Sequence, residues 1–264
     1  MHIRTLISII LLSASAILPG GSAAQSSDKP FTLVIDAGHG GKDFGCRGKT
    51  EYEKNITLDV ARRFRNLVNT QFGDSVTTVM TRDTDVFVPL GDRAKIANKA
   101  EGDLFVSIHV NSVDYKNKNR ANIHGASVYT VGLHKSEANL SVAMRENAVI
   151  ELEEDFSETY QGFDPNSSES YIIFELGQNH AMAQSVGFAS LVQNELVTTA
   201  GRTDKGVLQA GFLVLWATKM PSVLVELDFI CNAEAEKFLG SESGRQKCAE
   251  ALLNAFADYR KQSK

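Results

Sequence analysis

The sequence predicts an α/β fold: a single three-layer αβα domain, with a mixed, mostly parallel sheet between two layers of helices. Short apolar runs alternate with segments of helical periodicity along most of the chain, as in strands joined by crossover helices. The roughly 240 residues that follow the N-terminal segment are enough for one such domain with a full core. Cysteines are few, so packing rather than a disulfide framework is expected to hold the fold.

The expected strands are short runs of apolar and β-branched residues bounded by polar or turn-forming residues. They comprise 31–36, 76–81, 104–110, 126–131, 212–215 and 222–227. The expected helices carry apolar residues three and four positions apart. They comprise 53–71, 90–99, 136–152, 171–196 and 244–261. In the first helix, Ile56, Val60, Phe64, Leu67 and Val68 would form the face that packs on the sheet.

The first 24 residues have the composition of a secretory signal peptide. His2 and Arg4 precede an apolar run over 6–18, and small residues then lead to a cleavage site near Ala24. The apolar run is shorter than the roughly 20 residues that span a bilayer, which disfavours an uncleaved membrane anchor. We therefore expect a signal peptide at 1–24, a mature domain at 25–264 without a stable membrane span, and export to the periplasm.

Charge and cysteine content narrow the classes of partner and site. The formal net charge is -5 and no basic face dominates, which argues against a nucleic-acid partner. Cys46, Cys231 and Cys248 permit one disulfide and leave one thiol over, and their spacing does not choose the pair. No two of these cysteines form a CxxC motif, which argues against a cysteine-based metal site.

An acidic, polar stretch interrupts the pattern between 151 and 170. Its composition offers little to bury, so we expect a mobile loop there. Loops of this length inside a compact domain are usually functional or disordered. A solvated connector and a regulatory segment therefore both remain open.

Two histidines stand at the exits of strand-like runs, which places them at one edge of the predicted sheet. His39 follows the run 31–36, and His109 lies near the end of the run 104–110. Glu53 opens a helical segment between them. Two imidazoles and one carboxylate form the ligand set of a hydrolytic zinc site, in which the fourth position is left to water.

A hydrolytic zinc site also needs a group that accepts a proton from water. Glu226 lies inside an otherwise apolar strand, where burial would raise the pKa of its carboxyl group toward the working range of a general base. Asp228 is the competitor, since it would project from the same face if the strand continued that far. Glu226 is the preferred catalytic carboxylate.

Six motifs occur in an order that makes the chain recognisable. They are Ile35 to Asp43 (IDAGHGGKD), Glu53 to Asn55 (EKN), Thr81 to Asp83 (TRD), Arg93 with Ala97 and Asn98, Ser107 to Asn111 (SIHVN), and Pro221 to Glu226 (PSVLVE) followed by Phe229, Ile230 and Asn232. In this order they resemble the zinc-dependent N-acetylmuramoyl-L-alanine amidases of the Gram-negative cell-separation type. The resemblance runs from about Phe31 to Tyr259. It implies cleavage of the bond between glycan and stem peptide in peptidoglycan.

The resemblance implies a role for each matching residue. It assigns His39, Glu53 and His109 as ligands of one Zn²⁺ ion and Glu226 as the catalytic glutamate. Glu51 is a rival to Glu53, but the Glu-Lys-Asn context favours the latter. The family usually has proline where this chain has Ala37, and that departure touches no ligand.

Arg82, Arg93 and Asn111 also match family positions, either as support for the site or as substrate contacts. For the two arginines, ion pairing that fixes the loops around Asp36 or Asp83 is favoured over direct contact with substrate.

The region from about 145 to 195 corresponds to an insertion that relatives of this type often carry. In those relatives the insertion includes a helix that covers the zinc cleft until a partner protein displaces the helix. The resemblance therefore implies autoinhibition and a protein activator. The candidate carboxylates that could take the open zinc position are Glu146, Glu151, Glu153 and Glu154. The sequence does not rank them, and each could instead face solvent.

Two alternatives to the amidase remain at this level. A zinc carboxypeptidase that trims stem peptides would need an arginine for a terminal carboxylate, and Arg82, Arg93 or Arg120 could serve. A non-catalytic wall-binding protein could keep the fold, but the complete set His39, Glu53, His109 and Glu226 argues against it.

Overall fold

The computed structural model describes residues 29–154, 156–172 and 181–262. The expected signal peptide at 1–24 lies outside these residues, as do residues 173–180 of the helix expected at 171–196. None of the helices in the described ranges is both long and apolar enough to cross a membrane.

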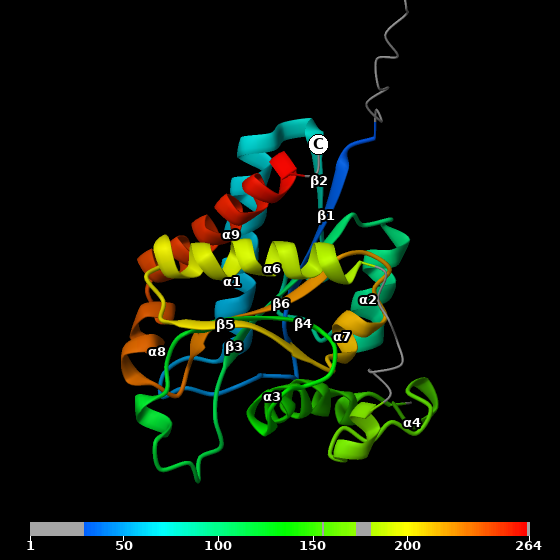
Figure 1. Cartoon of the computed structure of the whole chain (residues 1–264), viewed down its shortest axis with the longest axis vertical. Helices are drawn as coiled ribbons and strands as arrows, with labels where there is room; N and C mark the ends of the chain where they lie inside the picture. Colours follow the sequence, from blue (N-terminus) through cyan, green and yellow to red (C-terminus); the bar gives the residue numbers. More distant parts are fainter. Residues whose placement is uncertain (1–28, 155, 173–180, 263–264) are drawn as a thin grey trace, which may run out of the picture.

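Six strands form one sheet in the order β2-β1-β3-β6-β4-β5 (Figure 1). Their bounds are β1 Phe31–Ala37, β2 Val76–Met80, β3 Leu104–Asn111, β4 Ala126–Val131, β5 Asp204–Ala210 and β6 Ser222–Phe229. Neighbouring strands are parallel except β4 and β6, which are antiparallel. The expectation of a mixed, mostly parallel sheet is confirmed.

Helices cover both faces of the sheet (Figure 1). The helices are α1 Glu53–Phe72, α2 Leu90–Lys99, α3 Glu137–Asn147, α4 Phe156–Thr159, α6 Met182–Thr198, α7 Leu213–Trp216, α8 Ala233–Gly240 and α9 Glu242–Gln262, with 3₁₀ turns at η1 Gly73–Ser75, η2 Arg120–Asn122, η3 Ala148–Leu152 and η4 Ser168–Ile172. One buried cluster joins the sheet to α1, α6 and α9, and a second joins it to α2, α3 and α7. These two clusters are the cores of a three-layer αβα domain.

The face of α1 that the sequence predicts to pack on the sheet is buried in the structure. Ile56, Val60, Phe64 and Val68 are fully buried, and Leu67 packs against the same cluster at its edge. On the same side, α9 places Phe256 against the aromatic rings of α1 and β1. Burial of such side chains contributes roughly 1.5–3 kcal/mol each, which fixes α1 and hence the position of its first residue, Glu53.

The expected strand at 212–215 is wrong. That run begins with Phe212 and continues as the short helix α7, and the strand lies earlier, at Asp204–Ala210. A four-residue apolar run has no period that separates helix from strand. The real strand β5 lies at the edge of the sheet and is half exposed, so its sequence carries little apolar signal.

The mobile loop expected over 151–170 is also wrong, because its described residues fold. They contain part of η3, the helix α4 and part of η4. Phe163 and Tyr171 are buried and stack edge to face, with ring centroids 5.2 Å apart. Two aromatic rings anchor a segment whose average composition is polar.

Part of the segment 145–195, expected as an insertion, belongs to the layers of the fold. Helix α6 carries Phe188, Ala189, Val192 and Leu196 fully buried in the main core. It therefore belongs to one of the two helical layers. The rest comprises the end of α3 and the described residues up to Ile172, and it packs into the second core cluster through Ile150, Phe163 and Tyr171.

All three cysteines are free thiols, so the disulfide that the sequence permits is not formed.

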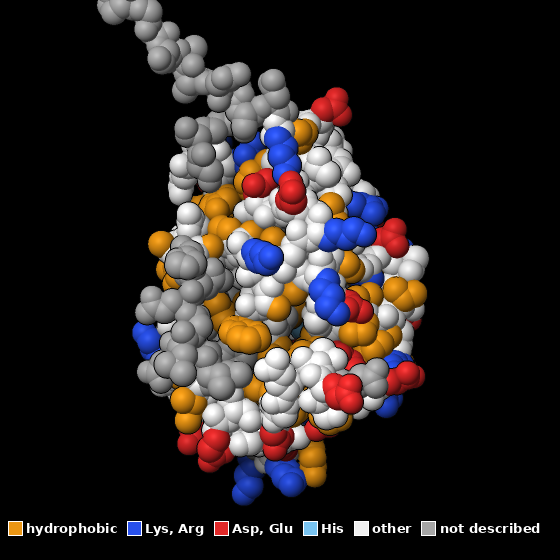
Figure 2. Space-filling model, turned by 90° about the vertical axis from the view of Figure 1, so that its right-hand side faces the viewer, with side chains coloured by type: hydrophobic (Ala, Val, Ile, Leu, Met, Phe, Trp, Pro, Cys, Tyr) orange, Lys and Arg blue, Asp and Glu red, His pale blue; other side chains and the backbone are white. Residues whose placement is uncertain are grey.

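The face that includes α2, α4 and α7 mixes acidic, basic and apolar side chains without a large basic patch (Figure 2).

Candidate metal and catalytic site

The first motif, residues 35–43, begins in β1 and continues beyond its end. Two buried arginines bind the backbone of this segment. Arg93 donates to Asp36 Oδ1 and to the carbonyl oxygens of Ala37 and His39 at 2.8 to 2.9 Å. Arg82 donates to the carbonyls of Ala37 and Gly38, both at 2.8 Å. His39 has φ of 62°, a left-handed conformation that costs a non-glycine residue of order 1 kcal/mol. The arginines hold the chain in this conformation, which turns the imidazole of His39 toward the edge of the sheet.

The second histidine and the candidate base come from neighbouring strands. His109 in β3 and Glu226 in β6 are register partners in a parallel pair. Residues paired in this way project from the same face of a sheet, so both side chains reach the side that α3 covers. Glu53, the first residue of α1, approaches from the other direction and is fully buried.

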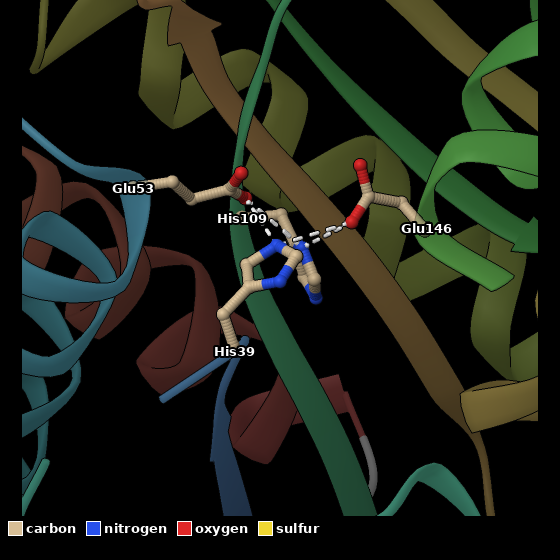
Figure 3. Close-up of side chains that lie close together, drawn as sticks. All are labelled: His39, Glu53, His109 and Glu146. Atoms are coloured by element: carbon tan, nitrogen blue, oxygen red, sulfur yellow. Dashed lines mark hydrogen bonds and ion pairs between the residues drawn. The ribbon is translucent and has the colours of Figure 1, made fainter. Parts of the chain in front are cut away.

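Four side chains converge on one point (Figure 3). Glu53 Oε1 lies 3.0 Å from His39 Nε2 and 3.1 Å from His109 Nδ1. Glu146 Oε2, from α3, lies 3.2 Å from His39 Nε2 and 3.0 Å from His109 Nδ1. The four donor atoms all lie within 4.8 Å of one another, and all four residues are buried.

This arrangement fits a zinc ion. Four ligands at about 2.0 Å from tetrahedral zinc lie about 3.3 Å from one another, close to the separations across this cluster. His39 Nε2 and Glu146 Oε2 are buried and, among the described residues, lie close only to other atoms of this cluster, with which they form no well-aligned hydrogen bond. Buried polar atoms without a partner are costly, and a metal ion would satisfy both.

Neighbouring groups orient two of the three ligands that the sequence singled out, His39 and Glu53. Asp43 Oδ2 accepts a hydrogen bond from His39 Nδ1 at 2.8 Å, which leaves Nε2 for the cluster. Glu53 accepts from the backbone N–H groups of Val110 at 2.8 Å and Cys46 at 2.7 Å. Burial opposes its ionisation, but the two imidazoles outweigh burial and lower the pKa of Glu53 to about 2.

Two glycines leave room for these ligands. A Cβ atom at Gly38 would lie 2.5 Å from the ring of His109, and one at Gly45 would lie 2.6 Å from His39 and 2.7 Å from Glu53. Gly45 also has φ of 64°, so a side chain there would be strained as well as crowded.

Glu226 is the unsatisfied carboxylate of the site. It is fully buried, and neither of its oxygens has a hydrogen-bond partner among the described residues. Burial, and next the charge of Glu146, raise the pKa of Glu226 to about 8. Arg145 Nη2 approaches Glu226 Oε1 to 3.7 Å. The competitor Asp228 is instead paired with Arg202 at 2.9 Å and accepts a hydrogen bond from the N–H of Gly125.

The other residues of the resemblance have structural partners. Glu51 pairs with Arg245 at 3.1 Å, away from the cluster, so the structure brings Glu53 and not Glu51 to the histidines. Arg93 forms the expected ion pair with Asp36, whereas Arg82 binds carbonyl groups and, in the described part of the chain, forms no ion pair with Asp83. Asn111 Oδ1 accepts a hydrogen bond from Arg145 at 3.0 Å.

The four candidate acids of the insertion lie in different places. Glu146 lies in the metal cluster. Glu151 accepts a hydrogen bond from Asn166, Glu153 accepts one from the N–H of Leu90, and Glu154 is exposed. The sequence could not rank them because all four belong to similar acidic surroundings.

Sequence reasoning assigned no role to Arg145 or Asp43. Arg145 bridges three parts of the site, since it contacts Glu146, Asn111 and the carbonyl of Ser112. No sequence signal marks it. Asp43, four residues after His39 within the glycine-rich motif, could have been found as a carboxylate partner of a ligating histidine.

Comparison with known proteins agrees with this geometry. The family model described as N-acetylmuramoyl-L-alanine amidase matches residues 33–258. The amidase AmiC of Escherichia coli strain CFT073 is 34% identical over 236 residues, which cover 88% of this chain and 53% of AmiC. AmiA of Escherichia coli K12 is 30% identical over 239 residues, which cover 89% of this chain and 78% of AmiA.

A solved amidase from Clostridium difficile 630 superimposes with a TM-score of 0.64 at 25% identity, covering 89% of this chain and all of that structure. The chain spans about half the length of AmiC and about three quarters of AmiA. Because the family model covers most of the sequence and the predicted fold is the fold of the family, this chain belongs to the N-acetylmuramoyl-L-alanine amidase family.

Proposed function

We propose that this chain is a zinc-dependent amidase. It hydrolyses the amide bond between N-acetylmuramic acid and L-alanine in peptidoglycan, in the service of cell-wall remodelling and daughter-cell separation. The observation that carries the proposal is the pairing of a buried His39, Glu53 and His109 donor set with the carboxylate of Glu226 on the strand next to His109, which accepts no hydrogen bond from the described residues. Membership of the family supports the substrate class.

His39 Nε2, Glu53 Oε1 and His109 Nδ1 would hold the zinc ion. When bound, zinc lowers the pKa of water to about 7 and polarises the scissile carbonyl group. Glu226 takes the proton from the attacking water and returns it to the departing nitrogen of L-alanine. Burial raises the pKa of Glu226, which suits a group that must both accept and donate a proton near neutral pH. Asp43 and the Val110 N–H keep the ligands in place.

We also propose that α3 holds the enzyme in an inhibited state. Glu146 Oε2 lies where a fourth zinc ligand would lie, 3.0 to 3.2 Å from the two imidazole donors. A carboxylate there would exclude both the attacking water and the substrate carbonyl. Arg145 neutralises the extra negative charge, because it donates to Glu146 at 3.0 Å and approaches Glu226.

A protein activator that displaces α3 would relieve this inhibition. Export to the periplasm through a signal peptide at 1–24 completes the proposal, since peptidoglycan lies outside the inner membrane. The resemblance of the insertion supports the activator, and the composition of residues 1–24 supports the signal peptide and the compartment.

The test is product analysis with zinc-loaded protein. Wild type and a Glu146→Ala variant are incubated with purified peptidoglycan, and the soluble products are identified by mass spectrometry. Free stem peptides that begin with L-alanine establish the amidase, and their release at a rate at least tenfold higher from the variant establishes the block by Glu146. Peptides shortened at the carboxyl end would reject the amidase in favour of a carboxypeptidase. Equal rates from both proteins would reject the block.

A further inference from the structure

The amino end of α2 lacks a cap from its own segment. The residue before the helix is Pro89, and no side chain of the local sequence accepts a hydrogen bond from the first turn. The first N–H groups of a helix need acceptors, and the helix dipole favours a negative charge at this end.

The inserted segment supplies the missing acceptors. Glu153 Oε1 accepts from the N–H of Leu90 at 2.9 Å, and the hydroxyl oxygen of Tyr160 accepts from the N–H of Gly91 at 2.9 Å. The Tyr160 hydroxyl in turn donates to Glu153, with its oxygen 3.0 and 3.2 Å from the two carboxylate oxygens. The two side chains therefore cap α2 as a hydrogen-bonded pair from a distant part of the chain.

The cap of α2 is linked to the metal cluster in two ways, through the segment that carries Glu153 and through α2 itself. Glu153 follows directly after η3, and Glu146 lies in the last turn of α3 just before it, so a short continuous helical stretch joins the two carboxylates. On the other side, α2 carries Arg93, which donates to the carbonyl of His39. The cap therefore connects the segment that bears Glu146 to the helix that positions a proposed zinc ligand.

The seam around the cap is hollow and lined by both polar and apolar groups, while Ile150 and Phe163 of the same segment pack into the second core cluster. A cavity of about 340 Å³ lies between the domain and the insertion, and Lys42, Asp92, Lys95, Glu153 and Glu154 are among its lining residues. Lys42 Nζ also donates to the carbonyl of Leu152 across this seam at 2.7 Å. Hydrogen bonds beside water contribute little each, so a few of them make a contact that can be broken in regulation.

We propose that Glu153 and Tyr160 form a second latch of the inhibited state, distinct from the contact of Glu146 with the metal cluster. The latch holds η3 and α4 on the amino end of α2, and this keeps α3 seated over the site. The inference rests on the proposed inhibition by α3 and adds to it: opening requires the cap to be released as well as Glu146.

The chain contains one tryptophan, and its position allows the latch to be followed without an activity assay. Trp216 is 47% exposed and lines a hollow of about 390 Å³ together with residues 159–163. Release of this segment would expose the indole further, so acrylamide would quench its fluorescence more strongly.

The experiment compares the zinc-loaded full chain with four variants: Glu153→Met, Tyr160→Phe, their combination, and Glu158→Met as a control. Glu158 is an exposed carboxylate on α4. Each change leaves the side-chain volume similar, so the fold is retained. Loss of one such hydrogen bond shifts an equilibrium about fivefold, and we expect the double variant to release stem peptides at least fivefold faster than wild type, with increased quenching of Trp216. The control should match wild type in both readouts.

The outcomes separate the latch from the proposed function. Unchanged quenching in the double variant overturns the latch. Increased quenching without faster release, while Glu146→Ala does release peptides faster, overturns its regulatory role and leaves the block by Glu146 standing. If Glu146→Ala releases stem peptides no faster than wild type, the inhibition by α3 fails, and the latch fails with it. If no protein releases stem peptides, the amidase itself is rejected.

Discussion

Glu226 differs from the other carboxylates around the cluster because no hydrogen bond from the described residues fixes it; its one charged neighbour, Arg145, lies 3.7 Å away. Glu53 accepts two backbone hydrogen bonds and Glu146 one from Arg145, whereas both oxygens of Glu226 lack a hydrogen-bond partner among the described residues. A ligand benefits from such fixed partners, while a base must exchange a proton. The contrast supports different roles for these carboxylates.

Replacing Glu226 by glutamine should therefore separate metal binding from turnover. The amide is nearly the same size but cannot accept the proton, so we expect zinc content to stay at one ion per chain and turnover to fall by 10² to 10⁴. Zinc is measured by elemental analysis and turnover by the release of stem peptides, both in the Glu146→Ala background. Turnover within threefold of the parent would reject Glu226 as the base.

A methyl group at Gly45 should weaken zinc binding. The added Cβ would meet His39 at 2.6 Å and Glu53 at 2.7 Å, so both ligands would have to shift. Disturbing the groups that orient ligands typically costs 10- to 100-fold in affinity, and we expect a loss in that range for Gly45→Ala by competition with a chelator. Gly187→Ala is the matched control, since a Cβ there meets nothing within 4 Å. Equal affinity in both variants would contradict the crowding argument.

Most of the site residues could be predicted because chemistry and position coincide in them. His39, Glu53, His109 and Glu226 are each polar residues at the end or in the interior of an apolar element, which is visible in sequence. Glu146 could only be included among four acids, since its position depends on how α3 lies across the sheet. Arg145 was missed because an arginine on a helix normally faces solvent.

At the scale of elements, β1 depends on a buried ion pair. Asp36 is fully buried and accepts hydrogen bonds from Arg93, Thr81 and Ser107. Burial opposes its ionisation, but Arg93 and the two hydroxyl groups outweigh burial and lower the pKa of Asp36. A carboxyl group with a lowered pKa in the folded state stabilises the fold above its unfolded pKa of about 3.9, and that stabilisation is lost as pH falls through the folded pKa.

The Asp36→Asn variant should make this dependence visible. It leaves the guanidinium of Arg93 buried without its counterion, which costs about 3–5 kcal/mol. We expect the difference in unfolding free energy between wild type and variant to be largest at pH 5 and above and to narrow below pH 4. Urea unfolding of the zinc-free proteins between pH 2.5 and 7 measures it, with the exposed Asp74→Asn as control. A difference that does not change with pH would contradict the lowered pKa.

Elements with a clear period were predictable and short ones were not. The expected helix 90–99 coincides with α2, and α1 and α9 begin or end within two residues of expectation. The helix expected over 136–152 is α3 followed by the 3₁₀ turn η3, because the apolar pattern does not distinguish the two. The cap of α2 by Glu153 and Tyr160 depends on two residues more than 60 positions away, which no local pattern records.

At the scale of the whole molecule, the proposed metal joins distant parts of the chain. His39, Glu53, His109 and Glu146 come from four separate elements or loops. A ligand that binds only the folded state stabilises it by about 4 kcal/mol when present at 1,000 times its Kd. For a domain of this size, that corresponds to a shift in Tm of about 10 °C.

We therefore expect chelation to lower the Tm by about 10 °C and added zinc to restore it, as measured by calorimetry. A His109→Ala variant serves as control and should show little change on either treatment. Equal melting temperatures with and without chelator in the wild type would mean that the buried cluster binds no metal.

The free thiols bear on how this fold tolerates oxidation. Burial raises the pKa of Cys46 well above its usual value, and the pKa of Cys248 to about 12. Thiol–disulfide exchange proceeds through the thiolate, so both cysteines are poor nucleophiles at neutral pH. The thiol of Cys46, whose backbone N–H binds Glu53, thus stays protonated beside the proposed zinc ligands. A domain with an odd number of cysteines can in this way pass through an oxidising environment without mispairing at its active site.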